Sequence, residues 1–374
     1  MKNKKIAIFF GGKITHHLRL LRMAARKLRV QLDLVSYNRV CFEAGKGVYI
    51  RGDKARMNET WEVSEYDVLF FRTTGKHWEE VSLILDAVKG KDITVVDPLV
   101  KNGRPSDACK AYQMLELAKA GIGVPKTIYG SLWYLYEMMK NKTQFSDQHF
   151  FSSGECGATF NVVKKTLMTK ADLDQKNLLA SDFALDFNFP IILKGSGGDR
   201  GSRVFKIDNL EEMEKMVRAL RKSETVEGKR YMVQKFIPNS GDYRLLILGE
   251  KVLGVMKRSS QSIEEFRNNY SVGGKVEVAD LPESIKKMAV KAAKVCGLMV
   301  AGVDVMEKPK SNSLKVLKSE SLKVKSRSFE DGEMSGDSND YVVLEVNKGP
   351  QFRGFMEATG IDVPKEIIKF LISL

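Results

Sequence analysis

Apolar residues in the first hundred positions form short runs separated by stretches with helical spacing. The runs predict strands at Lys5–Phe10, Leu32–Val35, Asp67–Phe71 and Thr94–Val96. Apolar residues recur every three or four positions from Leu18 to Leu28, and again around Val81–Val88, which predicts two helices. Strands that alternate with helices predict a parallel α/β sheet. Gly11-Gly12 ends the first strand, at the edge where such sheets hold ligands, but it lacks the full GxGxxG nucleotide fingerprint.

The rest of the chain gives a second set of elements. A helix is predicted to open at the capping residues Ser106-Asp107 and to end at Gly121. Further strands are predicted at Ile191–Lys194, Arg203–Ile207, Tyr231–Gln234, Arg244–Leu248, Val252–Met256, Ala301–Met306 and Tyr341–Asn347. Helices are predicted around Leu210–Leu220 and Pro282–Gly297, and residues 141–180 show no clear pattern.

Composition narrows the class of protein. Hydrophobic residues make up 43% and charged residues 29% of the 374 positions, which is typical of a folded globular chain. The apolar run Ile6–Phe10 is too short for a signal peptide and no later run approaches a membrane span, so we expect a cytoplasmic protein. The four cysteines form no CxxC pair, which argues against a zinc ribbon, a redox dithiol or a disulfide framework.

The net charge of +14 suggests an anionic partner, with a lysine-rich surface bias as the alternative. Residues 308–340 look like a low-complexity insertion between two strands, and we expect them to be disordered. The insertion carries seven basic and six acidic residues, a net of +1, so the excess charge belongs to the rest of the chain. A basic docking arm is the functional alternative for this segment.

The two strands that flank the insertion carry the most informative polar residues. Because side chains alternate along a strand, Glu345 and Asn347 share one face, and pairing with the strand 301–306 places Asp304 beside them. Two carboxylates and an amide oxygen are hard ligands suited to Mg²⁺, with phosphates completing the coordination. The alternative is a solvated sheet face with unrelated polar residues.

Two further stretches combine glycine with cationic or amide residues. Lys194–Gly201 follows a strand and precedes another, which favours a glycine-rich flap whose backbone N–H groups close over phosphates, or a plain hairpin turn. Arg244, Arg258 and Arg267, the last beside Asn268 and Asn269, can bind anionic oxygens through forked hydrogen bonds, or can form a basic surface.

The order of these pieces resembles the ATP-grasp ligases, specifically the RimK-like branch that joins glutamate or similar amino acids to a carboxylate. The resemblance covers about residues 106–374 and rests on Ile192–Lys194 with its flap, Val233–Ile237, Asp242–Gly249, Phe266–Asn269 with Gly273-Gly274, and Gly302–Asp304 with Glu345–Asn347. It implies a mixed α/β and α+β chain with an N-terminal α/β pre-ATP-grasp domain at 1–105. A two-lobed ATP-grasp fold would follow, with a small lobe at 106–235 and a C-terminal lobe at 236–374.

The same resemblance implies roles for individual residues. ATP would be bound by Lys110, Lys194, Gly197, Gly198, Gln234, Lys235, Phe236, Ile237, Asp242, Arg267, Asn268 and Asn269. Arg244, Arg258 and Arg267 would steady the transferred phosphate, and Asp304, Glu345 and Asn347 would ligate two Mg²⁺ ions, for which Mn²⁺ could substitute. Lys235 stands where relatives usually carry an acidic residue, and Lys348–Gly354 is longer than the usual Pro-Gly turn.

The implied activity is an ATP-dependent carboxylate–amine ligase that acts through an acyl phosphate and releases ADP and phosphate. Its partners would be ATP, a carboxylate acceptor and an amine such as glutamate. We expect no membrane partner, and the sequence leaves open whether the protein forms a homo-oligomer. A phosphotransferase on the same fold is the competing enzyme class. A basic nucleic-acid-binding protein is the weaker alternative, because no patch interleaves basic and aromatic residues.

Overall fold

The computed structural model describes residues 4–53, 59–75, 77–98, 109–140, 188–196, 203–260, 274–309 and 337–374. These residues form two compact units, Met1–Pro125 together with Ile237–Leu374, and Lys126–Phe236. The division of the chain into domains at 1–105, 106–235 and 236–374 stays a prediction. No helix in the described ranges is long and apolar enough to cross a membrane.

The first unit begins with the predicted parallel sheet. Its strands are β1 (Lys5–Phe10), β2 (Gln31–Ser36), β6 (Val68–Thr73) and β7 (Thr94–Val96), in the order β2-β1-β6-β7. All three pairings are parallel, which confirms the α/β expectation. Helices α1 (His16–Lys27) and α2 (Trp78–Ala87) connect the strands, and the Thr15 hydroxyl accepts a hydrogen bond from the Leu18 amide at the start of α1.

A small antiparallel sheet between β2 and β6 was not predicted. It contains β3 (Val40–Glu43), β4 (Gly47–Arg51) and β5 (Thr60–Glu62), flanked by the 3₁₀ turns η1 (Tyr37–Arg39) and η2 (Val63–Glu65). These strands are short and mostly half-exposed, so they lack the apolar alternation that reveals a strand in sequence.

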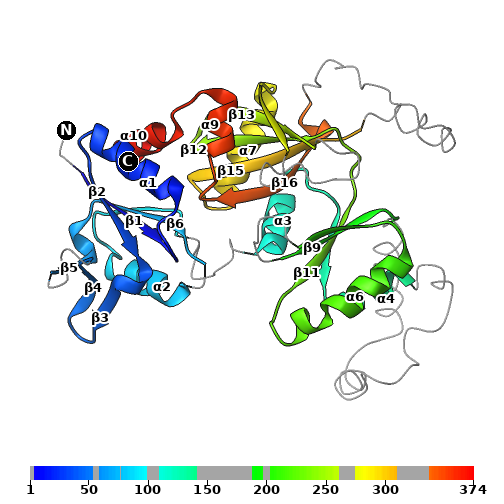
Figure 1. The fold of residues 1–374 in the computed structure, drawn as a ribbon, viewed down its shortest axis with the longest axis horizontal. Coiled ribbons are helices and arrows are strands. Elements are labelled where there is room, and N and C mark those ends of the chain that lie inside the picture. The colour runs from blue at the N-terminus through cyan, green and yellow to red at the C-terminus, as the bar shows by residue number, and fades with distance from the viewer. Residues whose placement is uncertain are drawn as a thin grey trace. The chain divides into compact units, whose positions relative to one another are not determined.

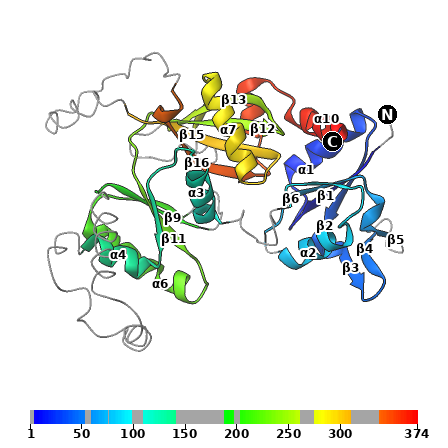
Figure 2. The same cartoon turned by 180° about the vertical axis from the view of Figure 1, so that it is seen from behind.

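The second sheet of this unit is antiparallel and has the order β14-β13-β12-β15-β16. Its strands are β12 (Asp242–Leu248), β13 (Lys251–Ser259), β14 (Lys275–Ala279), β15 (Val300–Glu307) and β16 (Tyr341–Lys348), with the turn η6 (Ser338–Asp340) before β16. The predicted hairpin turns at Gly249, whose φ is +60°. Helices α7 (Glu283–Val295) and α3 (Lys110–Lys119) pack against this sheet (Figure 2).

One hydrophobic core joins the two sheets. The C-terminal helices α9 (Arg353–Thr359) and α10 (Val363–Ser373) follow β16, and α10 lies beside α1 of the first sheet (Figure 1). Fully buried residues of both regions belong to this core, among them Ile8, Leu21, Val300, Phe355 and Leu371. On the face of its sheet that α1 covers, the N-terminal α/β region therefore has no separate core of its own.

The second unit is an antiparallel sheet of order β10-β9-β11-β8 with two helices on one face. The strands are β8 (Thr127–Gly130), β9 (Ile191–Gly195), β10 (Val204–Ile207) and β11 (Tyr231–Lys235), and the helices are α4 (Leu132–Lys140) and α6 (Leu210–Thr225). Leu193, Tyr231 and Val233 pack with these helices. Alternation along the strands places Lys194 and Gln234 on the opposite face.

Two predicted boundaries fall partly outside the described residues. Helix α3 begins at Lys110 with Cys109 at the N-cap, while Ser106-Asp107 lie outside the described ranges. Of the insertion at 308–340, only 308–309 and 337–340 are described, so its predicted disorder is not addressed by the structure.

Candidate active site

Strands β15 and β16 bring the predicted metal-binding residues together. Asp304 pairs in register with Glu345, and Gly302 pairs with Asn347. The Asn347 side-chain amide donates a hydrogen bond of 3.1 Å to Asp304 Oδ2. A register shift lies between Asp304 and Val305, so the ladder is irregular next to the carboxylate. The predicted convergence of these three side chains is present in the structure.

Asp304 is the centre of an ion-pair chain that runs across β12, β13 and β15. Arg244 lies opposite it on β12 and donates two hydrogen bonds of 2.7 Å, from Nε to Oδ1 and from Nη2 to Oδ2. Arg258 Nη2 lies 3.1 Å from Asp304 Oδ2. Burial alone would raise the pKa of Asp304, but the charges and hydrogen bonds of the two guanidinium groups outweigh burial and hold that pKa well below its usual range.

Asp242 lies at the other end of this ion-pair chain. Arg258 lies opposite it in the β12–β13 ladder, and Arg258 Nε is 2.5 Å from Asp242 Oδ1. Both side chains are almost fully buried, with 3% and 8% exposed. Burial would lower the pKa of Arg258, but the carboxylates of Asp304 and Asp242 raise it, so the guanidinium stays charged. Asp242 therefore has a structural partner within the sheet, and its predicted role in placing the nucleotide stays a prediction.

Lys110 joins the cluster from the first turn of α3. Its Nζ lies 3.0 Å from Glu345 Oε1, with 14% of the lysine and 19% of the glutamate side chain exposed. Gln113, one turn later, donates a hydrogen bond of 3.1 Å to the Val346 carbonyl and fixes α3 against β16. The family resemblance implies that Lys110 binds ATP phosphates, and the structure places it beside Glu345, a predicted metal ligand.

The donor set fits a divalent cation chemically. Asp304 and Glu345 supply carboxylate oxygens and Asn347 supplies an amide oxygen, all suited to Mg²⁺. The described residues contain no group of three or more His, Cys, Asp and Glu side chains that could hold a metal ion. A cation at this site would therefore need oxygens from a bound phosphate. It would also compete with arginine, because both oxygens of Asp304 accept hydrogen bonds from Arg244.

The predicted nucleotide residues of the second unit lie on β9 and β11 or just after β11. Lys194 is 8% exposed and Gln234 is 5% exposed, on the sheet face opposite the helices. The Gln234 amide donates to the Thr127 hydroxyl at 3.0 Å, so its side chain is engaged in the sheet. Lys235 is exposed, and the Lys206 ammonium lies 5.4 Å from the Phe236 ring centre.

Other predicted residues cannot be placed. Gly197, Gly198, Arg267, Asn268 and Asn269 lie outside the described residues. Ile237 belongs to the first unit, on the other side of the unit boundary from Gln234, Lys235 and Phe236.

A family model for the RimK-like ATP-grasp domain matches residues 161–329. Over these residues the chain is similar to RimK-like ATP-grasp domains. Curated relatives include probable alpha-L-glutamate ligases from Syntrophotalea carbinolica, 30% identical over 184 residues, and from Halorhodospira halophila, 31% identical over 184 residues. Each alignment covers 49% of this chain and 50% of the relative, so the chain spans about half the length of the curated relatives it matches.

Two solved structures, a macrocyclase and a ligase, are similar in fold to this chain. The macrocyclase MdnC from Microcystis aeruginosa, bound with its precursor peptide MdnA, superposes with a TM-score of 0.57 at 14% identity, covering 99% of each chain. D-alanine–D-alanine ligase from Bacillus anthracis, complexed with ATP, gives 0.52 at 16% identity, covering 99% of this chain and 96% of the other. At these identities the likeness shows the fold alone, and it confirms the predicted fold class.

A second charged cluster of the first unit was not predicted from the sequence. Arg72 at the end of β6 is 3% exposed and donates to the Pro350 carbonyl at 2.8 Å, directly after β16. Lys348 Nζ donates to the Thr74 hydroxyl at 2.8 Å. The Arg72 guanidinium lies 5.3 Å from the centre of the Phe352 ring. Burial lowers the pKa of Arg72 to about 10, although the negative charge of Asp97 acts to raise it. The sequence does contain one indication of this cluster. Arg72 and Asp97 are charged residues that directly follow apolar strand residues.

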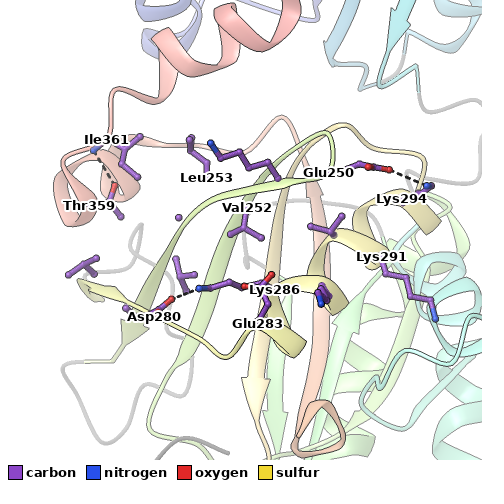
Figure 3. Close-up of a pocket in the computed structure, with 17 residues that line it drawn as sticks. Glu250, Val252, Leu253, Asp280, Glu283, Lys286, Lys291, Lys294, Thr359 and Ile361 are labelled. Carbon is purple, nitrogen blue, oxygen red and sulfur yellow. Dashed lines mark hydrogen bonds and ion pairs between the residues drawn. The ribbon is translucent and has the colours of Figure 1, made fainter. Parts of the chain in front are cut away.

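The five-stranded sheet also borders a surface groove of about 760 Å³ (Figure 3). Its lining comes from β13, the end of β14, helix α7, and the last residue of α9 with the turn that follows it. None of the residues of the Asp304 ion-pair chain line it. This groove was not predicted from the sequence, because its residues come from four separate segments.

Proposed function

We propose that the protein is an ATP-dependent carboxylate–amine ligase that forms an amide bond through an acyl phosphate. One observation carries the proposal: Asp304, Glu345 and Asn347 converge on adjoining strands next to Arg244. Asp304 lies within residues 161–329, which match the RimK-like ATP-grasp family model. Phosphoryl transfer needs groups that position phosphates and neutralise charge, and this cluster supplies both kinds of group. The proposed reaction requires no nucleophilic side chain.

Asp304, Glu345 and Asn347 would hold two Mg²⁺ ions, or Mn²⁺, together with ATP phosphate oxygens. When bound, these ions would neutralise charge on the transferred phosphoryl group. Lys110 and Lys194 would bind phosphates, with Gly197 and Gly198 in the flap. The segment Gln234–Ile237 would contact adenine, and Asp242, Arg267, Asn268 and Asn269 would help to place the nucleotide.

The two arginines of the cluster would have different roles. Arg258 is held by two carboxylates and is 3% exposed, so it would keep Asp304 in position throughout the reaction. The Arg244 side chain is 16% exposed, and Asp304 is its acidic partner in the described part of the chain. With a cation held by Asp304, Arg244 would be available to bind an anionic oxygen of the acyl phosphate. Arg267 would act beside it.

In the proposed reaction, an oxygen of the substrate carboxylate attacks the γ-phosphorus of ATP and ADP leaves. The amine then attacks the acyl carbon, and phosphate leaves from the tetrahedral intermediate. The relatives named alpha-L-glutamate ligases favour glutamate as a substrate. The solved macrocyclase bound with a precursor peptide favours a peptide as the carboxylate partner.

Trapping with hydroxylamine tests this proposal. The protein is incubated with Mg·ATP, hydroxylamine and a panel of free and peptide-borne carboxylates, and hydroxamates and ADP are measured. We expect hydroxamate to form with at least one carboxylate in the wild type and to be absent in Glu345→Gln. Glu277→Gln, on the edge strand β14, is the control that should keep activity. A stable phosphorylated product without hydroxamate would instead establish the phosphotransferase alternative.

A further inference from the structure

The groove beside the five-stranded sheet contains an open strand edge. Strand β13 runs over nine residues, Lys251–Ser259, but β14 pairs only with its second half, from Val255 opposite Ala279 to Ser259 opposite Lys275. The first half, Lys251–Gly254, pairs with β12 on its inner side and extends past the end of β14 on its outer side. Such an edge presents backbone donors and acceptors that another strand can use.

Two walls enclose this edge. Helix α7 forms one wall through Glu283, Lys286 and Val290, and the turn at Thr359 and Ile361 forms the other. In Figure 3, Lys286 points toward Asp280, with its Nζ 2.6 Å from Oδ1, while Thr359 and Ile361 lie across the groove. A single extended segment that continued the line of β14 would lie between these walls.

The charged residues of the groove are mainly basic. Its lining contains five lysines and three acids, a net charge of +2: Lys251, Lys286, Lys287, Lys291 and Lys294 against Glu250, Asp280 and Glu283. Two of the lysines are paired with acids, Lys286 with Asp280 and Lys294 with Glu250. Lys251 and Lys287 are exposed and form no ion pair with any acid in the described ranges. They are therefore available to bind carboxylates.

The groove also offers apolar surface. Val252, Leu253 and Ile361 are half-buried along its floor and far wall, and Val278 at the end of β14 is 66% exposed. Successive side chains of an added strand would point alternately toward the α7 side and toward Ile361. The geometry therefore favours an alternation of acidic and apolar residues over a uniformly acidic segment.

We propose that this groove docks an extended acidic segment of a peptide or protein partner, as an added strand along Lys251–Gly254. Four paired residues span about 13 Å at roughly 3.3 Å per residue, so the recognised segment would be short. Its backbone would pair with the edge of β13, and its carboxylates would meet Lys251 and Lys287. The proposal concerns binding alone and does not require the ligase reaction.

Fluorescence anisotropy without ATP or Mg²⁺ tests the proposal. The probe is a labelled eight-residue peptide of alternating glutamate and valine, titrated with the full chain at low and moderate salt. We expect saturable binding that weakens with salt. The double variant Lys251→Glu with Lys287→Glu should weaken binding at least tenfold. The variant Lys89→Glu with Lys91→Glu changes net charge equally on the first region and should leave affinity within twofold.

A second peptide separates strand addition from simple charge attraction. It has the same side chains but is N-methylated at alternate residues, which removes backbone donors and keeps every carboxylate. Loss of binding on N-methylation, with new hydrogen-exchange protection at Val252–Gly254, would support the proposal. Equal affinity of both peptides, equal loss in both double variants, or no binding at all would overturn it. In the last case, Lys251 would serve only to guard an open strand edge.

Discussion

At the scale of single residues, Asp304 and Glu345 have the same predicted ligand role but different surroundings. Asp304 is 5% exposed and accepts hydrogen bonds from Arg244 and Asn347 beside a contact from Arg258. Glu345 has 19% of its side chain exposed and pairs with Lys110. Loss of charge at Asp304 removes the acidic partner of Arg244 and one of the two carboxylates that pair with the buried Arg258, whereas water can reach Glu345.

This difference predicts that Asp304→Asn and Glu345→Gln both abolish turnover but differ in stability. We expect Asp304→Asn to lower the free energy of unfolding by about 3 kcal/mol, the range for breaking a buried ion pair. Glu345→Gln should cost about 1 kcal/mol or less, because the amide keeps a hydrogen-bond acceptor for Lys110. Urea unfolding of both variants and the wild type measures this. Equal losses of stability would contradict the central position assigned to Asp304.

A second residue, Asp97, predicts a pH dependence of stability. It is 1% exposed, has a φ of +52°, and accepts hydrogen bonds from the amides of Met299 and Val300. Burial raises the pKa of Asp97 to about 6 from 3.8, although those bonds and the charges of Lys348 and Arg72 act against the rise.

Because the folded pKa lies above the unfolded one, the native state binds more protons between pH 4 and 6. Stability from this residue therefore falls as pH rises through that window and is constant above it. In the wild type, this residue should lower the free energy of unfolding by roughly 2 to 3 kcal/mol as pH rises from 4 to 6, and Asp97→Asn should remove that decrease. The measurement is the wild-type-minus-variant difference in unfolding free energy from pH 3.5 to 7.5. Asp86→Asn, on the exposed side of α2, is the control that should follow the wild type.

At the scale of elements, the turn after β16 depends on the end of β6. Gly349 has a φ of +52°, and a Cβ there would lie 2.4 Å from the Arg72 carbonyl oxygen. Gly360, the C-cap of α9, has a φ of +69° with nothing within 4 Å of a Cβ. The two glycines share the left-handed conformation and differ in the space around them.

Alanine at each position is therefore a matched pair. Gly360→Ala should cost about 1 to 2 kcal/mol, the penalty for a left-handed alanine, and should keep activity. Gly349→Ala should cost clearly more, because the backbone must also shift away from Arg72. That shift moves the end of the strand that carries Glu345 and Asn347, so activity should fall as well. Thermal melting and ADP release measure both effects, and equal melting shifts would exclude the steric argument.

The elements show what sequence can and cannot predict. The pairing of β15 with β16 could be predicted, and so could the closeness of Asp304 to Glu345 and Asn347. Both strands are apolar runs in which the polar residues fall on one face. The two guanidinium groups on Asp304 were not, since register across β12, β13 and β15 depends on tertiary packing. The contact of Arg72 with Pro350 joins residues 278 positions apart, and no local pattern records such a distance.

At the scale of the whole molecule, the shared core binds the N-terminal region to the antiparallel sheet. Leu21 of α1 and Leu371 of α10 are both fully buried in it, along with Val300 of β15. Asp97 and Arg72 add polar contacts from the first region to Val300 and Pro350. We therefore expect the unit formed by Met1–Pro125 and Ile237–Leu374 to unfold as one cooperative body.

Leu371→Ala tests this cooperativity by native-state hydrogen exchange. The lost side chain leaves a cavity in the shared core and should lower the free energy of unfolding by about 2 to 5 kcal/mol. Because β1 and β12 belong to one cooperative unit, amide protection should fall by the same factor in both strands. Val217→Ala removes a buried side chain from α6 in the core of the second unit and should leave protection in β1 and β12 unchanged. A loss confined to β12 and α10 in the Leu371→Ala variant would mean that the N-terminal region unfolds independently, and residues 1–105 would then be a separate domain.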